Sequence, residues 1–448
     1  MGRPDRQRVG WPGSAVRMME WMVIGLFCAC LLACVIMDVS VLHALVLGLL
    51  LFLAYGRTKG LAWRELARLT FKGVARVRTI LIAFFLIGIL TAFWRASGTI
   101  AVIVCYAADL VAPPAFLLMC FLLNGCISIL TGTSFGTAAT MGVICAAMGN
   151  SLGVGPALTG GAVLSGVYLG DRCSPVSTSA LLVAALTRTD IYQNIKGMVR
   201  SSLLPFLLAC AAYFAIGILA SPGAAAIVDL EQVFSRGFEM HWISLLPAAV
   251  IILLSACRVD VKLSMAASIM SAVPLCLFLQ HMPAGSLFRA ALMGFCPEDA
   301  ELAAMVGGGG IVSMCKVAGI VCLSSGYVDL FQKTGLLNGA RQKMASLGRA
   351  ATPFAAMLAA SVITGMIACN QTLTILLTNQ LCTGMNRDRD AFAIDLEDSA
   401  VVVAPLIPWS IAGAVPLSAV DAPRTGILFA FYLFFLPAWR LAVSWKRP

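Results

Sequence analysis

The sequence predicts an all-α polytopic membrane protein of about 10–13 transmembrane helices, with two structural repeats that contain broken helices or hairpins. Three observations point to this class. The chain of 448 residues is 60% hydrophobic and 12% charged, whereas soluble proteins carry about 25% charged residues. The mean hydropathy is +0.93. Most apolar runs are long enough for a helix to cross a bilayer, and the sequence lacks the alternating strands of an outer-membrane barrel.

Charge is concentrated in a few loops, which predicts the orientation of the chain. The net charge of +10 would suggest nucleic acid on a soluble domain, but the basic residues have no interleaved aromatic residues and gather between apolar runs. Lysine and arginine accumulate in cytoplasmic loops. We therefore expect a multi-pass protein of the cell (inner) membrane, with the lipid bilayer as a partner, both termini in the cytoplasm and no nucleic-acid partner.

The residue types needed for metal or enzyme chemistry are not arranged in the usual patterns. Sixteen cysteines are scattered through apolar segments, and there are three histidines. Gly307–Gly310 lacks the lysine and the Ser/Thr of a phosphate-binding loop, and the HExxH and GxSxG motifs are absent. We expect no enzyme activity, no cofactor and no resident metal, so that the only ions bound are transported ones.

The first predicted part, 1–78, contains two spans and a basic segment. The apolar runs at about 18–37 and 39–56 are each close to the length of a bilayer-crossing helix. The segment 57–78 is rich in lysine and arginine, with Glu65 as its one acid. This is the strongest cytoplasmic signal in the chain, and it is also compatible with an amphipathic helix in the interface.

The second part, 79–220, is predicted to be the first transport repeat. Threonine, glycine and serine interrupt its long apolar run at 115–149, and a second break lies at 171–175. Free backbone polar groups are costly in hydrocarbon, so broken helices persist only inside protein or beside a wet cavity. We expect full or half spans at 79–94, 98–112, 115–149, 158–170, 175–187 and 201–220.

Connecting spans and a second repeat are predicted to follow. The part 221–302 holds spans at 242–257 and 261–280 with acidic outer loops, and 303–448 is the second transport repeat. That repeat starts with a span at 303–327 and a basic inner segment at 331–350. Its later spans and breaks are expected at 354–368, 371–382, 397–408 and 424–441.

The two repeats share one order of features. Pro114 precedes the polar pair Thr133-Ser134, and Pro353 precedes the pair Asn370-Gln371 at a similar distance. Each polar pair is followed by an apolar run, a loop, an acid and a proline break. This order indicates an internal duplication, and the copies are inverted if the number of spans between them is odd.

Carboxylates within the breaks are the first candidate site residues. An acid at membrane depth is costly and is functional by default, and Asp171 could bind a cation and a proton in turn. The alternatives for Asp171 are an ion pair with Arg172 or a place at the membrane surface. Glu397 and Asp398 are adjacent, so on a helix they point about 100° apart. One of them can face a cavity while the other reaches water or a helix N-terminus.

Neutral oxygens near these acids form the second group of candidates. Hydroxyl and amide oxygens suit sodium and other hard cations. The spacing of Gly132 and Gly136 also fits close helix packing, and Lys316 either balances a site carboxylate or extends to the membrane surface. The predicted ion- or substrate-binding residues beside the three acids are Thr131, Thr133, Ser134, Thr137, Ser174, Ser177, Asn370, Gln371 and Thr372.

Three stretches resemble the NhaC-type sodium/proton antiporter family, within the wider ion-transporter superfamily. They are TGTSFGT (131–137), GVYLGDRCSPVS (166–177) and LEDSAVVVAPLIPWSIAGA (396–414). The resemblance covers about 70–441 and implies a polytopic helical carrier with repeated halves that exchanges sodium for protons. Family members often continue Ser-Pro-x-Ser with Asp-Thr-Thr, whereas this chain continues with Thr178-Ser179-Ala180.

Two functions remain open at the level of the sequence. The first is sodium/proton antiport by alternating access, with transient sodium at Asp171 and Asp398. The second is a sodium- or proton-coupled carrier of a small organic acid or amino acid, whose carboxylate would be held by half-helix N-termini and the hydroxyls of 131–137. A homo-oligomer is compatible with both functions.

Overall fold

The computed structural model describes residues 13–445 except 38, 109–112, 176, 221–229, 258, 300–301, 304–305, 336–345, 349 and 386–387. Within this part every regular element is a helix, apart from an isolated antiparallel bridge between Phe295 and Gly308. The all-α class predicted from composition is therefore confirmed. The basic residues at 1–12 and much of the predicted inner segment 331–350 lie outside the described residues.

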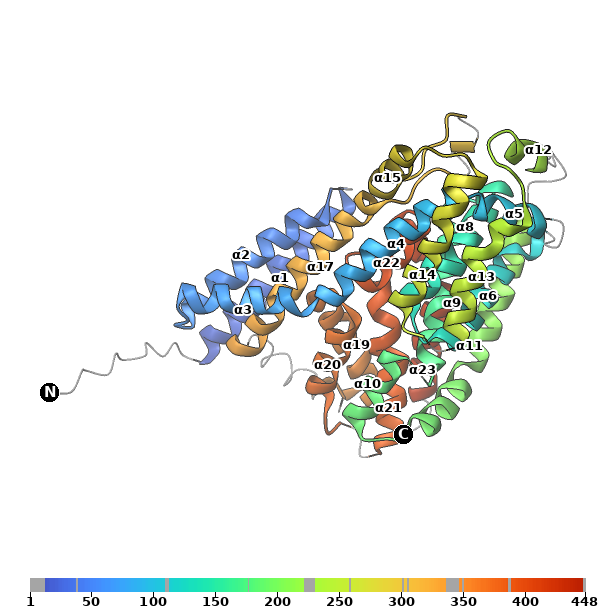
Figure 1. Ribbon diagram of the computed structural model, residues 1–448. Coiled ribbons are helices and arrows are strands. Elements are labelled where there is room, and N and C mark those ends of the chain that lie inside the picture. Colours follow the sequence, from blue (N-terminus) through green and yellow to red (C-terminus); the bar gives the residue numbers. More distant parts are fainter. Residues whose placement is uncertain are drawn as a thin grey trace.

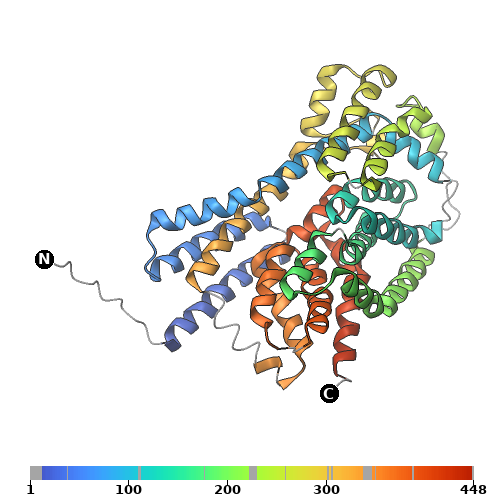
Figure 2. The same ribbon diagram turned by 60° about the horizontal axis from the view of Figure 1, so that its bottom comes forward.

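Four helices form an arm that extends from the rest of the molecule (Figures 1 and 2). Its core contains Phe27, Phe52, Tyr327 and Phe331, whose neighbouring ring centroids are 4.7–6.0 Å apart. The arm thus joins the first predicted part to the start of the last one. Its members are α1 (Gly13–Ile36), α2 (Val41–Thr58), α3 (Trp63–Arg76) and α17 (Ile311–Thr334).

The first repeat is divided where the sequence places its polar stretch. Helix α6 (Phe116–Thr131) ends at Gly132, whose φ of 66° is left-handed, and Thr133 caps α7 (Ser134–Thr137) by accepting from Gly136 N. The other elements are α4 (Arg78–Ala96), α5 (Thr99–Ala108), η1 (Pro113–Ala115), η2 (Ala138–Gly142), α8 (Val143–Ser151), α9 (Pro156–Cys173), α10 (Thr178–Thr187) and α11 (Ile191–Ala220).

The second repeat is divided in the same way. Helix α19 (Pro353–Ala368) ends at Cys369, whose φ of 55° is again left-handed, and Asn370 caps α20 (Gln371–Cys382) by accepting from Leu373 N. Both α6 and α19 are 16 residues long, which fits the predicted duplication. The later elements are α21 (Arg389–Leu396), η5 (Glu397–Val401), η6 (Ala404–Leu406), α22 (Ile411–Ala419), η7 (Arg424–Phe429) and α23 (Phe431–Trp445).

Further helices connect the two repeats. They are α12 (Leu230–Ser235), η3 (Trp242–Leu245), α13 (Leu246–Ala256), α14 (Val261–Pro274), η4 (Leu275–Leu279) and α15 (Ala284–Met293). Of these, α12 and α15 lie at the end of the molecule opposite the C-terminus, while α13 and α14 run along the bundle (Figure 1). Helix α14 packs on both α13 and α4. This contact attaches the connecting part to the first repeat.

Few described helices are long enough to cross a bilayer alone. The four that combine the necessary length and hydropathy are Val41–Thr58, Ile191–Leu219, Lys262–Leu279 and Ile311–Phe331. Two helix pairs are bent by 43° and 57° at short breaks, namely Trp63–Ala75 with Ile80–Ala96 and Arg389–Leu406 with Ile411–Ala419. Breaks divide the remaining apolar runs, so the predicted number of spans stays a prediction.

Helices α6 and α9 approach closely through glycines. A Cβ added to Gly170 would lie 2.3 Å from Ser128 Cβ, and one added to Gly166 would lie 2.5 Å from Phe121 O. The Ser128 hydroxyl donates to Val167 O at 2.6 Å across the same contact. Gly166 and Gly170 therefore allow the close packing of α6 and α9.

We predict that Gly170→Ala destabilises the protein, because the new Cβ would collide with Ser128 across the α6–α9 contact. Overpacking of this kind costs about 1–3 kcal/mol. The measurement is the thermal unfolding midpoint in detergent. Gly25→Ala is the matched control, since its Cβ would meet nothing within 4 Å. Equal midpoints for the two variants would contradict the close approach.

Candidate functional site

The two repeats meet where their broken helices end. Asp171 lies in the last turn of α9, and a short non-helical stretch leads from there to Ser177, the N-cap of α10. Glu397 and Asp398 lie in η5, a stretch of π-helix that is wholly buried. Such π-helical turns are rare and occur frequently at functional sites. The predicted acids of both repeats are thus buried in one region.

Asp171 is enclosed by three hydrogen-bond donors from both repeats. The hydroxyls of Ser177 and Ser179 donate to its two carboxylate oxygens at 2.8 and 2.9 Å. Gln371 Nε2 donates to Oδ2 at 3.3 Å from the second repeat. With an exposed fraction of 3%, Asp171 is enclosed by protein. Its carboxylate is held by neutral groups rather than by Arg172.

Two helix N-termini point toward the Asp171 carboxylate. Ser177 caps α10, and Gln371 is the first residue of α20. Helix N-termini carry a partial positive charge and unpaired N–H groups, which favour an anion nearby. The ionised form of Asp171 is therefore stabilised by half-helices from both repeats. Both N-termini exist because α9 and α19 end shortly before them.

Arg172 and Asp398 form a buried ion pair between the repeats. Arg172 Nη2 donates to Asp398 Oδ1, and both side chains have an exposed fraction of 0%. Ser201 Oγ bridges the two, accepting from Arg172 at 3.0 Å and donating to Asp398 at 3.2 Å. Arg172 also donates to Met198 O and to the Tyr432 hydroxyl, each at 3.3 Å. Arg172 Nε and Asp398 Oδ2 have no hydrogen bond to any described residue, so the pair is satisfied only in part.

A second arginine extends this network toward the C-terminus. Arg440 donates to Asp395 Oδ1 at 3.0 and 2.8 Å, and its Nε lies 3.7 Å from Asp398 Oδ2. The sequence analysis named neither Asp395 nor Arg440 as a site residue. The sequence spacing could have pointed to Asp395, because residues three apart lie on the same face of a helix and Asp395 is three residues before Asp398.

Glu397 differs from its neighbours in having no direct partner. Its side chain is completely buried, and neither carboxyl oxygen has a hydrogen bond to any residue that the structure describes. The carboxyl is near enough to interact electrostatically with Arg172, Asp171 and Asp398. Glu397 and Asp398 therefore have different surroundings, as their helical offset predicts. A buried carboxyl without a partner is costly unless it is protonated or binds a cation.

The hydroxyls of the first break bond mainly within that break. Thr133 Oγ1 accepts from Gly136 N, and Thr137 Oγ1 donates to Thr133 O at 2.9 Å and lies 3.0 Å from Thr131 Oγ1. Ser134 is buried at the start of α7. Ser174 Oγ donates to Ile129 O at 2.7 Å and so fixes the other break against α6. These bonds stabilise irregular backbone.

Asn370 and Gln371, the second polar pair, have different roles. Asn370 caps α20 and also donates to Ala368 O at 3.0 Å, whereas Gln371 reaches Asp171. Thr372 is exposed and faces away from the buried acids. Lys316 is also exposed, on α17 of the arm, which fits a side chain that extends to the membrane surface.

A cavity of about 460 Å³ reaches the edge of the ion-pair network. It is lined by Asn194, Ser201, Asp388 and Arg440 among others. Ser201 and Arg440 also contact Asp398. The start of α11 and the helix α23, which carry these residues, lie near the C-terminal end of the bundle (Figure 1). Water in this cavity would therefore contact Ser201 and Arg440, the side chains that contact Asp398.

Broken helices from two repeats that enclose buried carboxylates define a class of membrane protein. Secondary transporters place ion and substrate sites at discontinuous helices where repeats meet, near the middle of the bilayer. The arrangement of Asp171, Glu397 and the Arg172–Asp398 pair fits that class.

The chain belongs to the Na+/H+ antiporter family, whose sequence profile matches residues 12–190 and 166–442. The chain is 26% identical to the Na(+)/H(+) antiporter NhaC of Alkalihalophilus pseudofirmus, over 88% of this chain and 87% of that protein. It is 25% identical to the malate-2H(+)/Na(+)-lactate antiporter of Bacillus subtilis, over 87% and 86%. It is 24% identical to the arginine/ornithine antiporter ArcD of Halobacterium salinarum, over 84% and 80%.

We predict that Arg172→Gln and Asp398→Asn are each destabilising, because each leaves one buried charge without its partner. Breaking a buried ion pair in this way costs about 3–5 kcal/mol. The double variant Arg172→Gln/Asp398→Asn should recover much of that loss, since it removes both charges. The thermal unfolding midpoint in detergent measures the effect, with Arg64→Gln as an exposed control. Additive losses in the double variant would contradict the pairing.

Proposed function

We propose that this protein is a sodium/proton antiporter that works by alternating access. The observation that carries the proposal is that two buried carboxyls, Asp171 and Glu397, form no ion pair within the described part of the chain. The family membership supports the same reaction class. The proposed setting is the cell membrane with both termini in the cytoplasm. The mechanism involves no covalent step and no resident cofactor.

Charge balance gives the physical reason for exchange. Among the described residues, the buried acids Asp171, Asp395, Glu397 and Asp398 have two bases beside them, the buried Arg172 and the partly exposed Arg440. If all of them were ionised, two negative charges would remain uncompensated in a region of low dielectric, at a cost of several kcal/mol each. Sodium or protons can supply the missing positive charge. When one kind of cation enters the cluster, electrostatics favours the departure of the other.

We assign the two exchanging positions to Asp171 and Glu397. Sodium would bind the Asp171 carboxylate together with oxygens of Ser177, Ser179 and Gln371, because hydroxyls can rotate to offer a lone pair and the amide carries a carbonyl oxygen. Glu397 would carry a proton while sodium is absent. The sequence analysis gave the second exchanging role to Asp398, whose partners Arg172 and Arg440 favour a fixed charge instead.

A second candidate function is exchange of small organic acids or amino acids coupled to sodium or protons. It is favoured by the relatives named as malate-2H(+)/Na(+)-lactate and arginine/ornithine antiporters, which cover this chain about as fully as the NhaC relatives do. In the conformation described, Arg172 is buried against Asp398 and is not free to bind a substrate carboxylate.

Sodium-driven proton movement in everted vesicles with an acid interior tests the first function. We predict that added sodium collapses the pH gradient with the wild type, and that Asp171→Asn and Glu397→Gln reduce the response to that of vesicles without the protein. The variant Ser179→Ala removes a hydroxyl that contacts Asp171 and should raise the half-saturating sodium concentration by roughly 10-fold. The exposed Glu239→Gln serves as control.

The roles of the acids can be separated in the same vesicles. The double variant Arg172→Gln/Asp398→Asn keeps the charge balance and should retain measurable exchange. No response of the well-inserted wild type to sodium, lithium or potassium would contradict the first function. Responses to lactate, malate or arginine in that case would support the second.

A further inference from the structure

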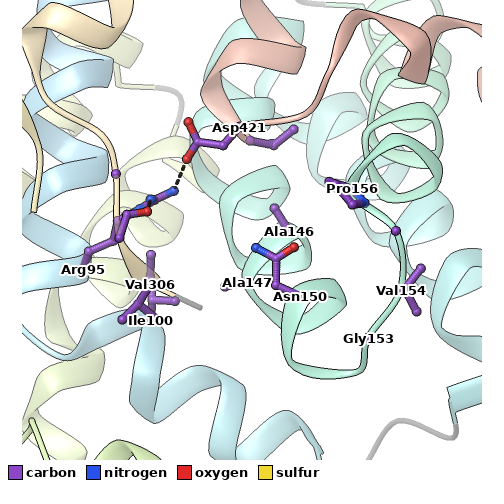
Figure 3. A pocket seen from close by; sticks show the side chains of 14 residues that line it. Arg95, Ile100, Ala146, Ala147, Asn150, Gly153, Val154, Pro156, Val306 and Asp421 are labelled. Atoms are coloured by element: carbon purple, nitrogen blue, oxygen red, sulfur yellow. Dashed lines mark hydrogen bonds and ion pairs between the residues drawn. The ribbon is translucent and has the colours of Figure 1, made fainter. Parts of the chain in front are cut away.

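A second cavity, of about 530 Å³, lies at the end of the bundle opposite the C-terminus and is lined by residues of α5, α8 and the loop before α17 (Figures 1 and 3). Arg95 and Asp421 face each other on one side of it, and Asn150 and Pro156 lie on the other. The distribution of basic residues predicts that this end faces the outside of the cell. The transport site described above does not include any of these residues.

Arg95 joins three separate segments beside this cavity. It lies in the last turn of α4, and its Nη2 donates to Asp421 Oδ2 at 2.7 Å. Its Nη1 donates to the backbone carbonyl of Gly307, in the loop that precedes α17. Arg95 Nε is buried without a partner among the described residues. A guanidinium thus fills the space between a carboxylate and a carbonyl oxygen.

The glycine loop is shaped to admit this guanidinium. Gly308 has a φ of 122°, and a Cβ there would lie 2.3 Å from Arg95 Nη1 and 3.0 Å from Asp421 Oδ2. Any side chain at this position would enter the ion pair. The run Gly307–Gly310, which the sequence excludes as a phosphate loop, therefore brings a carbonyl oxygen to the position opposite Asp421.

We propose that the Asp421 carboxylate and the Gly307 carbonyl oxygen form an outer cation-binding site, which Arg95 occupies as a tethered competitor in this conformation. The inference deepens the proposed function, because it places a sodium site at the outer mouth of the antiporter. A carboxylate and a backbone carbonyl are the ligand types that hard cations prefer. Sodium arriving from the cavity would replace the guanidinium on both oxygens.

Exposure and helix electrostatics favour a cation at this point. The Asp421 side chain is 49% exposed, whereas that of Arg95 is 8% exposed. The carboxylate is thus open to the cavity while the guanidinium approaches it from the protein side. Asp421 follows the C-terminus of α22, and Arg95 is at the C-terminus of α4. Helix C-termini carry a partial negative charge that favours a cation nearby.

Displacement of Arg95 would also free the end of α22. The Arg95–Asp421 bond ties α22 to α4, and at its other end Ala412 O of α22 accepts from the Tyr168 hydroxyl of α9 at 2.7 Å. Tyr168 lies about one helical turn before Asp171 on α9. Sodium binding at the outer site would therefore loosen a helix that contacts the helix carrying Asp171.

Transport kinetics on both faces of the membrane test this inference. Initial rates of proton flux would be measured against sodium concentration in right-side-out and everted vesicles. Arg95→Gln removes the competitor, so the half-saturating sodium concentration should fall roughly threefold to tenfold on the face that bears the cavity. Asp421→Asn should raise it by a similar factor on that face. Arg95→Lys should change it less, and the exposed Arg289→Gln should leave it unchanged.

A binding measurement keeps the inference separate from the proposed function. In the Asp171→Asn background, sodium should still raise the thermal unfolding midpoint in detergent relative to choline. Asp421→Asn should abolish that residual shift, and Arg95→Gln should enlarge it. The inference is overturned if the residual shift is absent or is insensitive to Asp421→Asn. It is also overturned if Arg95→Gln changes only the maximal rate, because Arg95 would then be a latch and not a competitor.

Discussion

The buried ion pair between Arg172 and Asp398 determines the charge of the proposed transport site, because it uses the basic residue next to Asp171 to neutralise one acid of the second half of the chain. Asp171 and Glu397 each immediately precede one member of the pair in sequence, and neither has a cationic partner of its own among the described residues. A buried pair of this kind adds little net stability but is costly to break. Its effect is to hold the two repeats together and to concentrate negative charge on two carboxyls.

The broken helices make this arrangement possible. An unbroken helix has no free N–H groups along its middle, whereas α10 and α20 begin beside Asp171, where Ser177 and Gln371 donate to its carboxylate. The capping residues Thr133, Ser177 and Asn370 satisfy part of the exposed backbone. The hydroxyl-rich stretch at 131–137 therefore acts largely as support for the break, and the donors to Asp171 come from Ser177, Ser179 and Gln371.

The sequence predicted the helical class, the two breaks and the location of the buried acids, because an acid, a proline or a threonine–glycine run within an apolar stretch is conspicuous. It could not predict the partners of those acids. Arg172 and Asp398 are far apart in sequence, and only the packing of the repeats decides that Arg172 contacts Asp398 rather than Asp171. The role of Gly307–Gly310 was also hidden, since it depends on Arg95 and Asp421 meeting at that loop.

Proton release on sodium binding tests the central claim most directly. Purified wild-type protein in weakly buffered detergent solution would be mixed with sodium chloride or choline chloride in the presence of a pH indicator. The account predicts that sodium, but not choline, acidifies the solution, and that Asp171→Asn abolishes this release. Sodium that stabilises the wild type against heat without releasing protons would contradict competition between the two cations at the buried carboxyls.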